Sequence, residues 1–227
     1  MGGQACVFYG AAEFSRDVDI AILADNENIE NLRSALSELD ADVIAVPAFD
    51  PTFLHRGLAI HFRCKAPGVE GMRIDVMSCM RGVDPFPALW ERRTTIEIDQ
   101  IEIDLLSLPD LVLAKKTQRS KDWPMLERLV EAHWFQNRHH PNPQRIRFWL
   151  RECRIPEILT ELAKQYPAET QELLSERILL KEALMQDPET LAQLLETERQ
   201  EEVAKDKAYW NPLKKELEQL RLDRAKE

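Results

Sequence analysis

Two carboxylates one residue apart are the strongest chemical signal in this chain. Asp17 and Asp19 lie in the run Ser-Arg-Asp-Val-Asp-Ile-Ala-Ile-Leu (residues 15–23), whose second half is apolar enough to form a buried strand. Residues i and i+2 of a strand point to the same side, so both carboxylates face one way. Hard divalent cations prefer carboxylate oxygens as ligands. The run therefore predicts one wall of a metal site at the mouth of a core strand.

Two carboxylates rarely complete such a site, so a third is expected from a neighbouring strand. Asp75, in Met-Arg-Ile-Asp-Val-Met-Ser (residues 72–78), has the same apolar flanks and is the best candidate. Cations held in this way can neutralise the charge that develops during phosphoryl transfer. The alternative is that the Asp-Val-Asp triplet is a solvated strand end or turn cap that holds no metal.

A glycine pair, Gly2-Gly3, precedes the acidic run, separated from it by residues 4–16. Gly-Gly, a spacer, Asp-hydrophobic-Asp-hydrophobic and a later Asp with apolar flanks occur in that order. This arrangement resembles the signature of the DNA polymerase beta-like nucleotidyltransferase superfamily. The resemblance implies an α/β (α+β) fold, with a mixed sheet flanked by helices. In these enzymes the glycine pair normally ends a first core strand, but only Met1 stands before Gly2. We therefore expect either that the true start lies upstream or that the domain lacks this strand.

The resemblance also implies roles for individual residues. Asp17, Asp19 and Asp75 would be catalytic and would bind two Mg²⁺ ions, with Mn²⁺ as an alternative metal. The first two would bridge the ions, and the third would hold the catalytic ion and help to activate the attacking hydroxyl. Triphosphate oxygens would be contacted by small residues, namely Gly2, Gly3 and Ser15.

A basic segment, Lys-Lys-Thr-Gln-Arg-Ser-Lys-Asp-Trp (residues 115–123), carries a second, looser resemblance. Small bacterial nucleotidyltransferases related to AbiEii-type toxins and to minimal nucleotidyltransferases carry a helix with a Lys, followed by an Arg and a Lys-Asp pair. By this resemblance Lys115 or Lys116 would reach the triphosphate, and Lys121 would support nucleotide binding. The alternative is a solvated basic helix end that interacts favourably with the helix dipole.

Composition limits the classes of partner. The chain has 227 residues, is 44% hydrophobic and has a formal net charge of −10, with no basic stripe of the kind that holds duplex DNA. No stretch approaches the roughly 20 apolar residues of a membrane span, and no signal peptide is evident. The four cysteines show no CxxC spacing, which argues against a zinc site or a disulfide framework. These features favour a cytoplasmic enzyme that binds neither duplex DNA nor a membrane.

The remaining patterns predict the elements that position these residues. A helix is expected over residues 26–39 with Asn26 or Asn28 as its cap, and short strands over 43–46, 58–64, 72–78, 94–98 and 101–106. Residues 49–56 are expected to form an irregular loop, and a helix should begin at Ser107. His61, inside a predicted strand, is the one histidine expected near the site.

The chain is predicted to divide into a catalytic domain, residues 1–135, and a helical extension, residues 136–227. Leucine and isoleucine recur at helical spacing after residue 150, and Pro156, Pro167, Pro188 and Pro212 are expected to separate several amphipathic helices. The default is that these helices pack on their own chain. The alternative is a homodimer or partner surface.

The predicted reaction moves a nucleoside monophosphate from an NTP to a hydroxyl on an RNA end, a protein side chain or a small molecule. A toxin-like role follows from the resemblance alone. Two other classes stay open. The chain could bind nucleotide and metal without turnover, or it could be an interaction protein that acts through its C-terminal helices.

Overall fold

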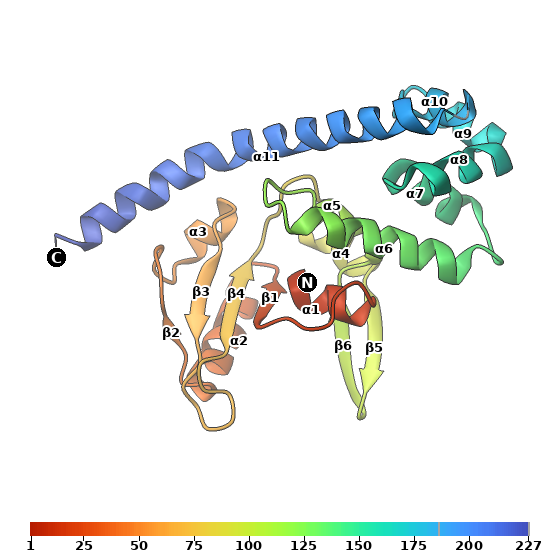
Figure 1. Cartoon of the computed structure of the whole chain (residues 1–227). Coiled ribbons are helices and arrows are strands. Elements are labelled where there is room, and N and C mark those ends of the chain that lie inside the picture. The colour runs from red at the N-terminus through yellow and green to blue at the C-terminus, as the bar shows by residue number, and fades with distance from the viewer. Residues whose placement is uncertain (186, 227) are drawn as a thin grey trace. The chain divides into compact units, whose positions relative to one another are not determined.

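The computed structural model describes residues 1–185 and 187–226, which form a mixed α/β protein (Figure 1). The predicted fold class is confirmed. The chain divides into two compact units. The first contains Met1–Ala114 and Ala208–Glu227, and the second contains Lys115–Lys207. The division expected at residue 135 lies inside the second unit, within helix α6 (Asp122–Asn137).

A four-stranded mixed sheet forms the centre of the first unit, with strand order β1-β4-β3-β2. Its strands are β1 (Asp17–Ala21), β2 (Asp42–Val43), β3 (Ile60–Arg63) and β4 (Arg73–Met77). β1 and β4 are parallel, whereas β3 is antiparallel to both β4 and β2. The hairpin predicted for residues 58–78 is confirmed. The strand predicted over residues 43–46 is shorter and begins earlier, because Pro47 and the turn that follows leave little chain to pair.

The two faces of this sheet differ in chemistry, because successive strand residues point to opposite sides. One face is apolar and belongs to a buried cluster with helix α2 (Asn26–Glu38), which contributes Ile29 and Leu36. The other face carries the charged residues of β1, β3 and β4. The α2 cap is Asp25, whose side chain accepts a hydrogen bond from Asn28 N at 2.8 Å. The prediction of Asn26 or Asn28 as cap is therefore wrong, since a carboxylate one residue earlier reaches the free amide.

The second sheet is a hairpin of β5 (Thr94–Ile98) and β6 (Ile101–Leu105), as predicted. Its two turn residues, Asp99 and Gln100, have φ values of 51° and 67°, the left-handed geometry of a tight two-residue hairpin turn. Directly after it, Ser107 accepts a hydrogen bond from Asp110 N at 3.3 Å and caps helix α5 (Leu108–Ala114), which confirms the predicted start of that helix.

Three further short helices belong to the first unit: α1 (Gly2–Phe8), α3 (Pro51–His55) and α4 (Phe86–Glu91). The prediction of an irregular loop over residues 49–56 is therefore wrong, because α3 lies within this segment. The Asp50 carboxylate accepts a hydrogen bond from Thr52 N at 2.8 Å, and a proline follows at the first helical position, a combination that starts a helix turn. The glycine pair opens helix α1.

The second unit is helical. It contains α6 to α10 and most of α11, namely α6, α7 (Pro143–Glu152), α8 (Pro156–Gln165), α9 (Pro167–Leu173), α10 (Leu180–Met185) and α11 (Pro188–Arg224). Prolines open α7, α8 and α9, where a missing N–H costs no hydrogen bond. Pro212, in contrast, does not separate two helices but lies inside α11. The Leu, Lys and Glu residues that follow Pro212 favour helix, and α11 continues through this position.

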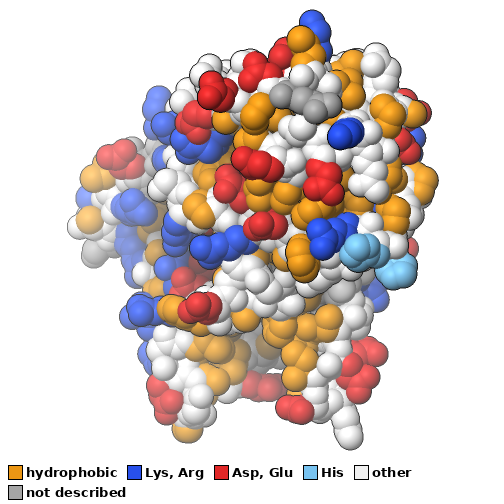
Figure 2. All heavy atoms as spheres, turned by 45° about the vertical axis from the view of Figure 1, so that its right-hand side comes forward, with side chains coloured by type: hydrophobic (Ala, Val, Ile, Leu, Met, Phe, Trp, Pro, Cys, Tyr) orange, Lys and Arg blue, Asp and Glu red, His pale blue; other side chains and the backbone are white. Residues whose placement is uncertain are grey.

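The surface is charged and mixed. On the face that Figure 2 presents, basic and acidic side chains are interspersed with hydrophobic ones. None of the described helices is long and apolar enough to cross a lipid bilayer.

Candidate active site

The sheet brings the three predicted carboxylates onto one face. In the parallel pairing of β1 with β4, Asp19 lies opposite Asp75, and Asp17 lies opposite Arg73. Neighbouring strands are about 4.8 Å apart, so the three carboxylates and the guanidinium belong to adjacent positions. His61 of β3 is opposite Asp75 on its other side. Asp17 and Asp75, which are 58 residues apart in the sequence, thereby contribute to one polar surface.

Asp75 is the most enclosed of these residues, with 12% of its side-chain surface exposed. Both of its oxygens accept hydrogen bonds from Arg73, from Nε to Oδ1 at 2.8 Å and from Nη2 to Oδ2 at 3.0 Å. The Nδ1 atom of His61 lies 2.8 Å from the same Oδ1. Burial alone would raise the pKa of Asp75, but the hydrogen bonds from His61 and Arg73 outweigh it and hold this pKa below the ordinary value. Asp75 is therefore a carboxylate at neutral pH.

Arg73 links the members of the site. Its pKa is raised, first by the hydrogen bonds to Asp75 and further by the charges of Asp75, Asp17 and Asp19. Nη2 of Arg73 also lies 3.1 Å from His61 Nδ1. The sequence reasoning missed Arg73, although one signal was present: in a strand, a residue two places before an acid lies on the same face.

The glycine pair packs against the first acidic strand. Gly2 has a φ of 68°, and a Cβ at this position would overlap the Asp19 carboxylate. Gly3 N donates to Asp19 Oδ2 at 3.2 Å, and a Cβ on Gly3 would overlap the side chain of Ser15. These glycines allow the start of α1 to lie directly on the acidic strand.

Ser15 supports the same strand from its beginning. Its hydroxyl donates to the backbone carbonyl of Asp17 at 3.0 Å, and its own carbonyl accepts a hydrogen bond from the Gln4 side chain at 3.0 Å. The structure thus brings Gly2, Gly3 and Ser15 next to the carboxylates. Their contact with a triphosphate remains a prediction.

The predicted lysines belong to the second unit and not to the sheet that carries the carboxylates. Lys115 is buried, with its ammonium 3.7 Å from Asp122, and Lys116 pairs with Glu152 at 2.7 Å. Asp122 also accepts hydrogen bonds from the Thr117 hydroxyl at 2.6 Å and the Arg119 guanidinium at 3.0 Å. Lys121 is exposed beside them, at the residue before α6. Much of the basic segment therefore makes ion pairs and hydrogen bonds near the start of this helix, with Lys115 and Asp122 buried.

The three carboxylates are ligands of the kind that hard cations prefer, but oxygens of Asp19 and Asp75 already accept hydrogen bonds. Asp17, Asp19 and Asp75 supply the carboxylate oxygens that Mg²⁺ and Mn²⁺ prefer. Within residues 1–185 and 187–226, however, no three acidic, histidine or cysteine side chains converge as a ligand group. At Asp75, the Arg73 guanidinium donates a hydrogen bond to each of the two oxygens. A cation that used Asp75 would have to displace the Arg73 guanidinium.

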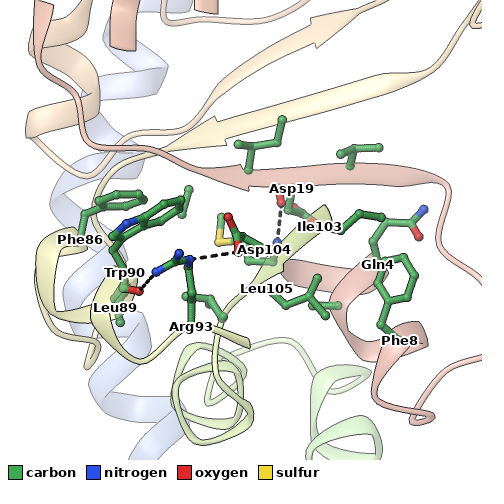
Figure 3. Close-up of a pocket in the computed structure, with 16 residues that line it drawn as sticks. Gln4, Phe8, Asp19, Phe86, Leu89, Trp90, Arg93, Ile103, Asp104 and Leu105 are labelled. Carbon is green, nitrogen blue, oxygen red and sulfur yellow. Dashed lines mark hydrogen bonds and ion pairs between the residues drawn. The ribbon is translucent and has the colours of Figure 1, made fainter. Parts of the chain in front are cut away.

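A cavity of about 380 Å³ opens beside Asp19, within the first unit. Figure 3 shows aromatic side chains of α4, Phe86 and Trp90, on one side and Phe8 of α1 on the other. Arg93 and Asp104 lie between them and are joined by a 3.0 Å hydrogen bond. No sequence pattern predicted this cavity, because its walls come from helices and a hairpin whose packing is set by the tertiary fold.

Comparisons with known proteins give no further guide: no family model, no curated protein and no solved structure matches the chain.

Proposed function

We propose that this protein is a metal-dependent nucleotidyltransferase that moves a nucleoside monophosphate from an NTP to a hydroxyl acceptor. One observation carries the proposal: the parallel pairing of β1 and β4 sets Asp17, Asp19 and Asp75 on one face of the sheet, beside a cavity. Three hard-ligand carboxylates on two adjacent strands, next to a concave surface, suit chemistry on a phosphate held by metal.

In this proposal Asp17, Asp19 and Asp75 would hold two Mg²⁺ ions, with Mn²⁺ as an alternative, and the metal would neutralise negative charge on the triphosphate. The acceptor oxygen forms a bond to the α-phosphorus while the bond from that phosphorus to the bridging oxygen breaks, and pyrophosphate leaves. Asp75 takes the proton of the attacking hydroxyl, directly or through water. While Arg73 is paired with Asp75, the depressed pKa keeps this carboxylate ionised, and release of Arg73 makes it a stronger base for the incoming proton.

Arg73 has two roles in the same cycle. Without nucleotide it neutralises Asp75, and with nucleotide its planar fork is free to pair with phosphate oxygens. The acceptor is an RNA end, a protein side chain or a small molecule, and a cytoplasmic, toxin-like role is part of the proposal. Neither duplex DNA nor a membrane is proposed as a partner, and the C-terminal helices remain candidates for dimer or partner contacts.

A second candidate is a protein that binds nucleotide and metal without turnover. The observation that favours it is the bidentate Arg73–Asp75 pair, because a permanently engaged Asp75 could neither complete the metal site nor accept a proton. The experiment below separates the two candidates.

The test is transfer of label from NTPs that carry ³²P at the α-phosphate. The full chain is incubated with Mg²⁺, each NTP in turn, and separate pools of RNA, protein and small metabolites. We expect one pool to gain label, and we expect Asp19→Asn and Asp75→Asn to reduce the rate by more than about a hundredfold. Loss of even an outer partner of a metal ligand typically costs about 10- to 100-fold, and these variants remove a ligand itself.

Asp42→Asn is the matched control. Asp42 is an aspartate at the far edge of the same sheet, on β2, with 62% of its side chain exposed and an ion pair to Lys65. It should keep the parent rate. Binding of Mg·NTP without label in any pool would favour the non-catalytic candidate, and equal rates for Asp19→Asn and Asp42→Asn would overturn the assignment of the site.

A further inference from the structure

The cavity beside Asp19 has walls that are unusually apolar and exposed. Trp90 keeps 43% of its surface exposed and Phe8 keeps 40%, although both line a concave surface where closer packing would bury them. Phe86 stacks on Trp90, with ring centroids 5.8 Å apart and planes inclined by 21°. Exposed aromatic side chains around one cavity indicate a binding surface.

Two charged side chains line the cavity: the Asp104 carboxylate accepts hydrogen bonds, and the Arg93 guanidinium donates them. Asp104 Oδ1 accepts from the Thr95 hydroxyl at 2.6 Å and from Arg93 Nε at 3.0 Å, which leaves Oδ2 with capacity as an acceptor. Arg93 also donates to the Trp90 carbonyl at 2.8 Å, and its guanidinium lies 3.9 Å from the centre of the Trp90 ring. The pair is about one-third exposed, so both side chains can meet a ligand.

The chemistry of the cavity favours one part of a nucleotide over the others. Its charged groups offset one another, because Asp104 is paired with Arg93 and the carbonyl of Asp19 accepts a hydrogen bond from the N-terminal ammonium of Met1, and most of the lining is apolar. A neutral planar ring suits such a lining. It can stack on aromatic walls and can use both the acceptor of Asp104 and the donors of Arg93, since every nucleobase edge carries a donor next to an acceptor.

We propose that this cavity binds the nucleobase of the NTP, and that Asp104 and Arg93 contact the edge of the base. The inference rests on the proposed function, because it places the base beside the carboxylates that would hold the triphosphate through metal. A volume of about 380 Å³ lies in the range of pockets that enclose small ligands, and an apolar lining with few polar groups is typical of them.

The test uses four nucleosides, adenosine, guanosine, cytidine and uridine, with the full chain in the presence of EDTA. Nucleosides lack phosphate, so their binding requires neither metal nor turnover. Binding is followed by ligand-observed NMR at millimolar concentrations. Ile103→Phe fills the cavity from β6, where Ile103 is half-buried in its wall. Ile101→Phe is the matched control, because Ile101 is on the same face of the same strand, is 65% exposed and lies outside the cavity.

We expect at least one nucleoside to bind the parent and the Ile101→Phe chain alike. Ile103→Phe should weaken that binding by about 5- to 150-fold, which corresponds to one base-stacking contact. Asp104→Asn keeps the volume but replaces one of the two acceptor oxygens by an NH2 donor, so it should change the order in which the four nucleosides bind. This variant keeps the test decisive even if Ile103→Phe fails to fold.

Absence of binding by all four nucleosides, or equal binding by Ile103→Phe and Ile101→Phe, would overturn the inference. Failure of label transfer is a separate outcome, since the nucleoside test does not depend on it. Conversely, if label transfer is observed and Ile103→Phe leaves the KM for every NTP unchanged, the base binds elsewhere while the proposed function stands.

Discussion

Replacing Arg73 by Met is the most informative perturbation of the carboxylate face. Arg73 makes a two-point contact with Asp75 that any metal ion or proton must displace to reach this carboxylate. Met keeps most of the length and the apolar stem of the side chain but has no charge and no donor. We therefore expect Arg73→Met to bind Mg²⁺ or Mn²⁺ more tightly than the parent.

The size of the effect follows from the bonds lost. Hydrogen bonds to a charged group contribute about 1.5–3 kcal/mol net, and the Arg73 side chain is 37% exposed, which favours the lower part of that range. A cation that uses Asp75 no longer has to break them. Since about 1.4 kcal/mol is a factor of ten, the metal dissociation constant should fall by about tenfold, with about 150-fold as an upper bound.

The assay is isothermal titration of the metal-free chain with Mn²⁺, compared among four proteins. These are the parent, Arg73→Met, Asp75→Asn and the double variant, which together form a double-mutant cycle. The gain from Arg73→Met should vanish when Asp75 is Asn. If Arg73→Met leaves the affinity unchanged or weakens it while the chain remains folded, the metal does not use Asp75, and the three-carboxylate assignment is wrong.

The same variant has a signature in stability. The folded-state pKa of Asp75 is depressed from its ordinary value of 3.8, so its interactions contribute stability above that pH and lose it as the pH falls further. At pH 7 the free energy of unfolding of Arg73→Met should therefore be lower than that of the parent by about 1.5–3 kcal/mol. Urea unfolding between pH 7 and pH 2 should show this gap closing below about pH 4. A gap that does not depend on pH would mean that packing of the Arg73 stem, and not the ion pair, carries the contribution.

Two further predictions concern the glycine pair and the basic segment. Gly2→Ala should lower the free energy of unfolding by at least about 1–2 kcal/mol more than Gly10→Ala does. Both glycines have positive φ, but only Gly2 has a carboxylate where the Cβ would stand. Thermal unfolding of the two variants measures this difference, and equal losses would contradict the packing of Gly2 on Asp19. Lys115→Met should destabilise the chain by about 1–3 kcal/mol because it removes a buried partner of Asp122, whereas exposed Lys121→Met should change stability by less than about 0.5 kcal/mol. A stable Lys115→Met chain with weakened NTP binding would instead favour a nucleotide contact.

Local patterns in the sequence were enough to place many of the elements. Alternation of apolar and charged residues predicted the strands that carry Asp17, Asp19 and Asp75, because a period of two is a property of the extended backbone itself. Turn residues between residues 64 and 72 predicted the β3–β4 hairpin, and a serine followed by leucine and proline predicted the start of α5. Errors occurred where a single side chain decides the outcome, as with the Asp50 cap that begins α3.

The sequence by itself therefore determined that three carboxylates occupy strands and that the first two share a face. Only the tertiary structure decided that β1 lies beside β4, that Arg73 and His61 engage Asp75, and that α1, α4 and β6 enclose a cavity next to Asp19. Strand order depends on which apolar faces pack together, over separations that no local period encodes. Ion-pair choice depends on which charges the packed backbone brings within reach, as the burial of Lys115 against Asp122 also illustrates.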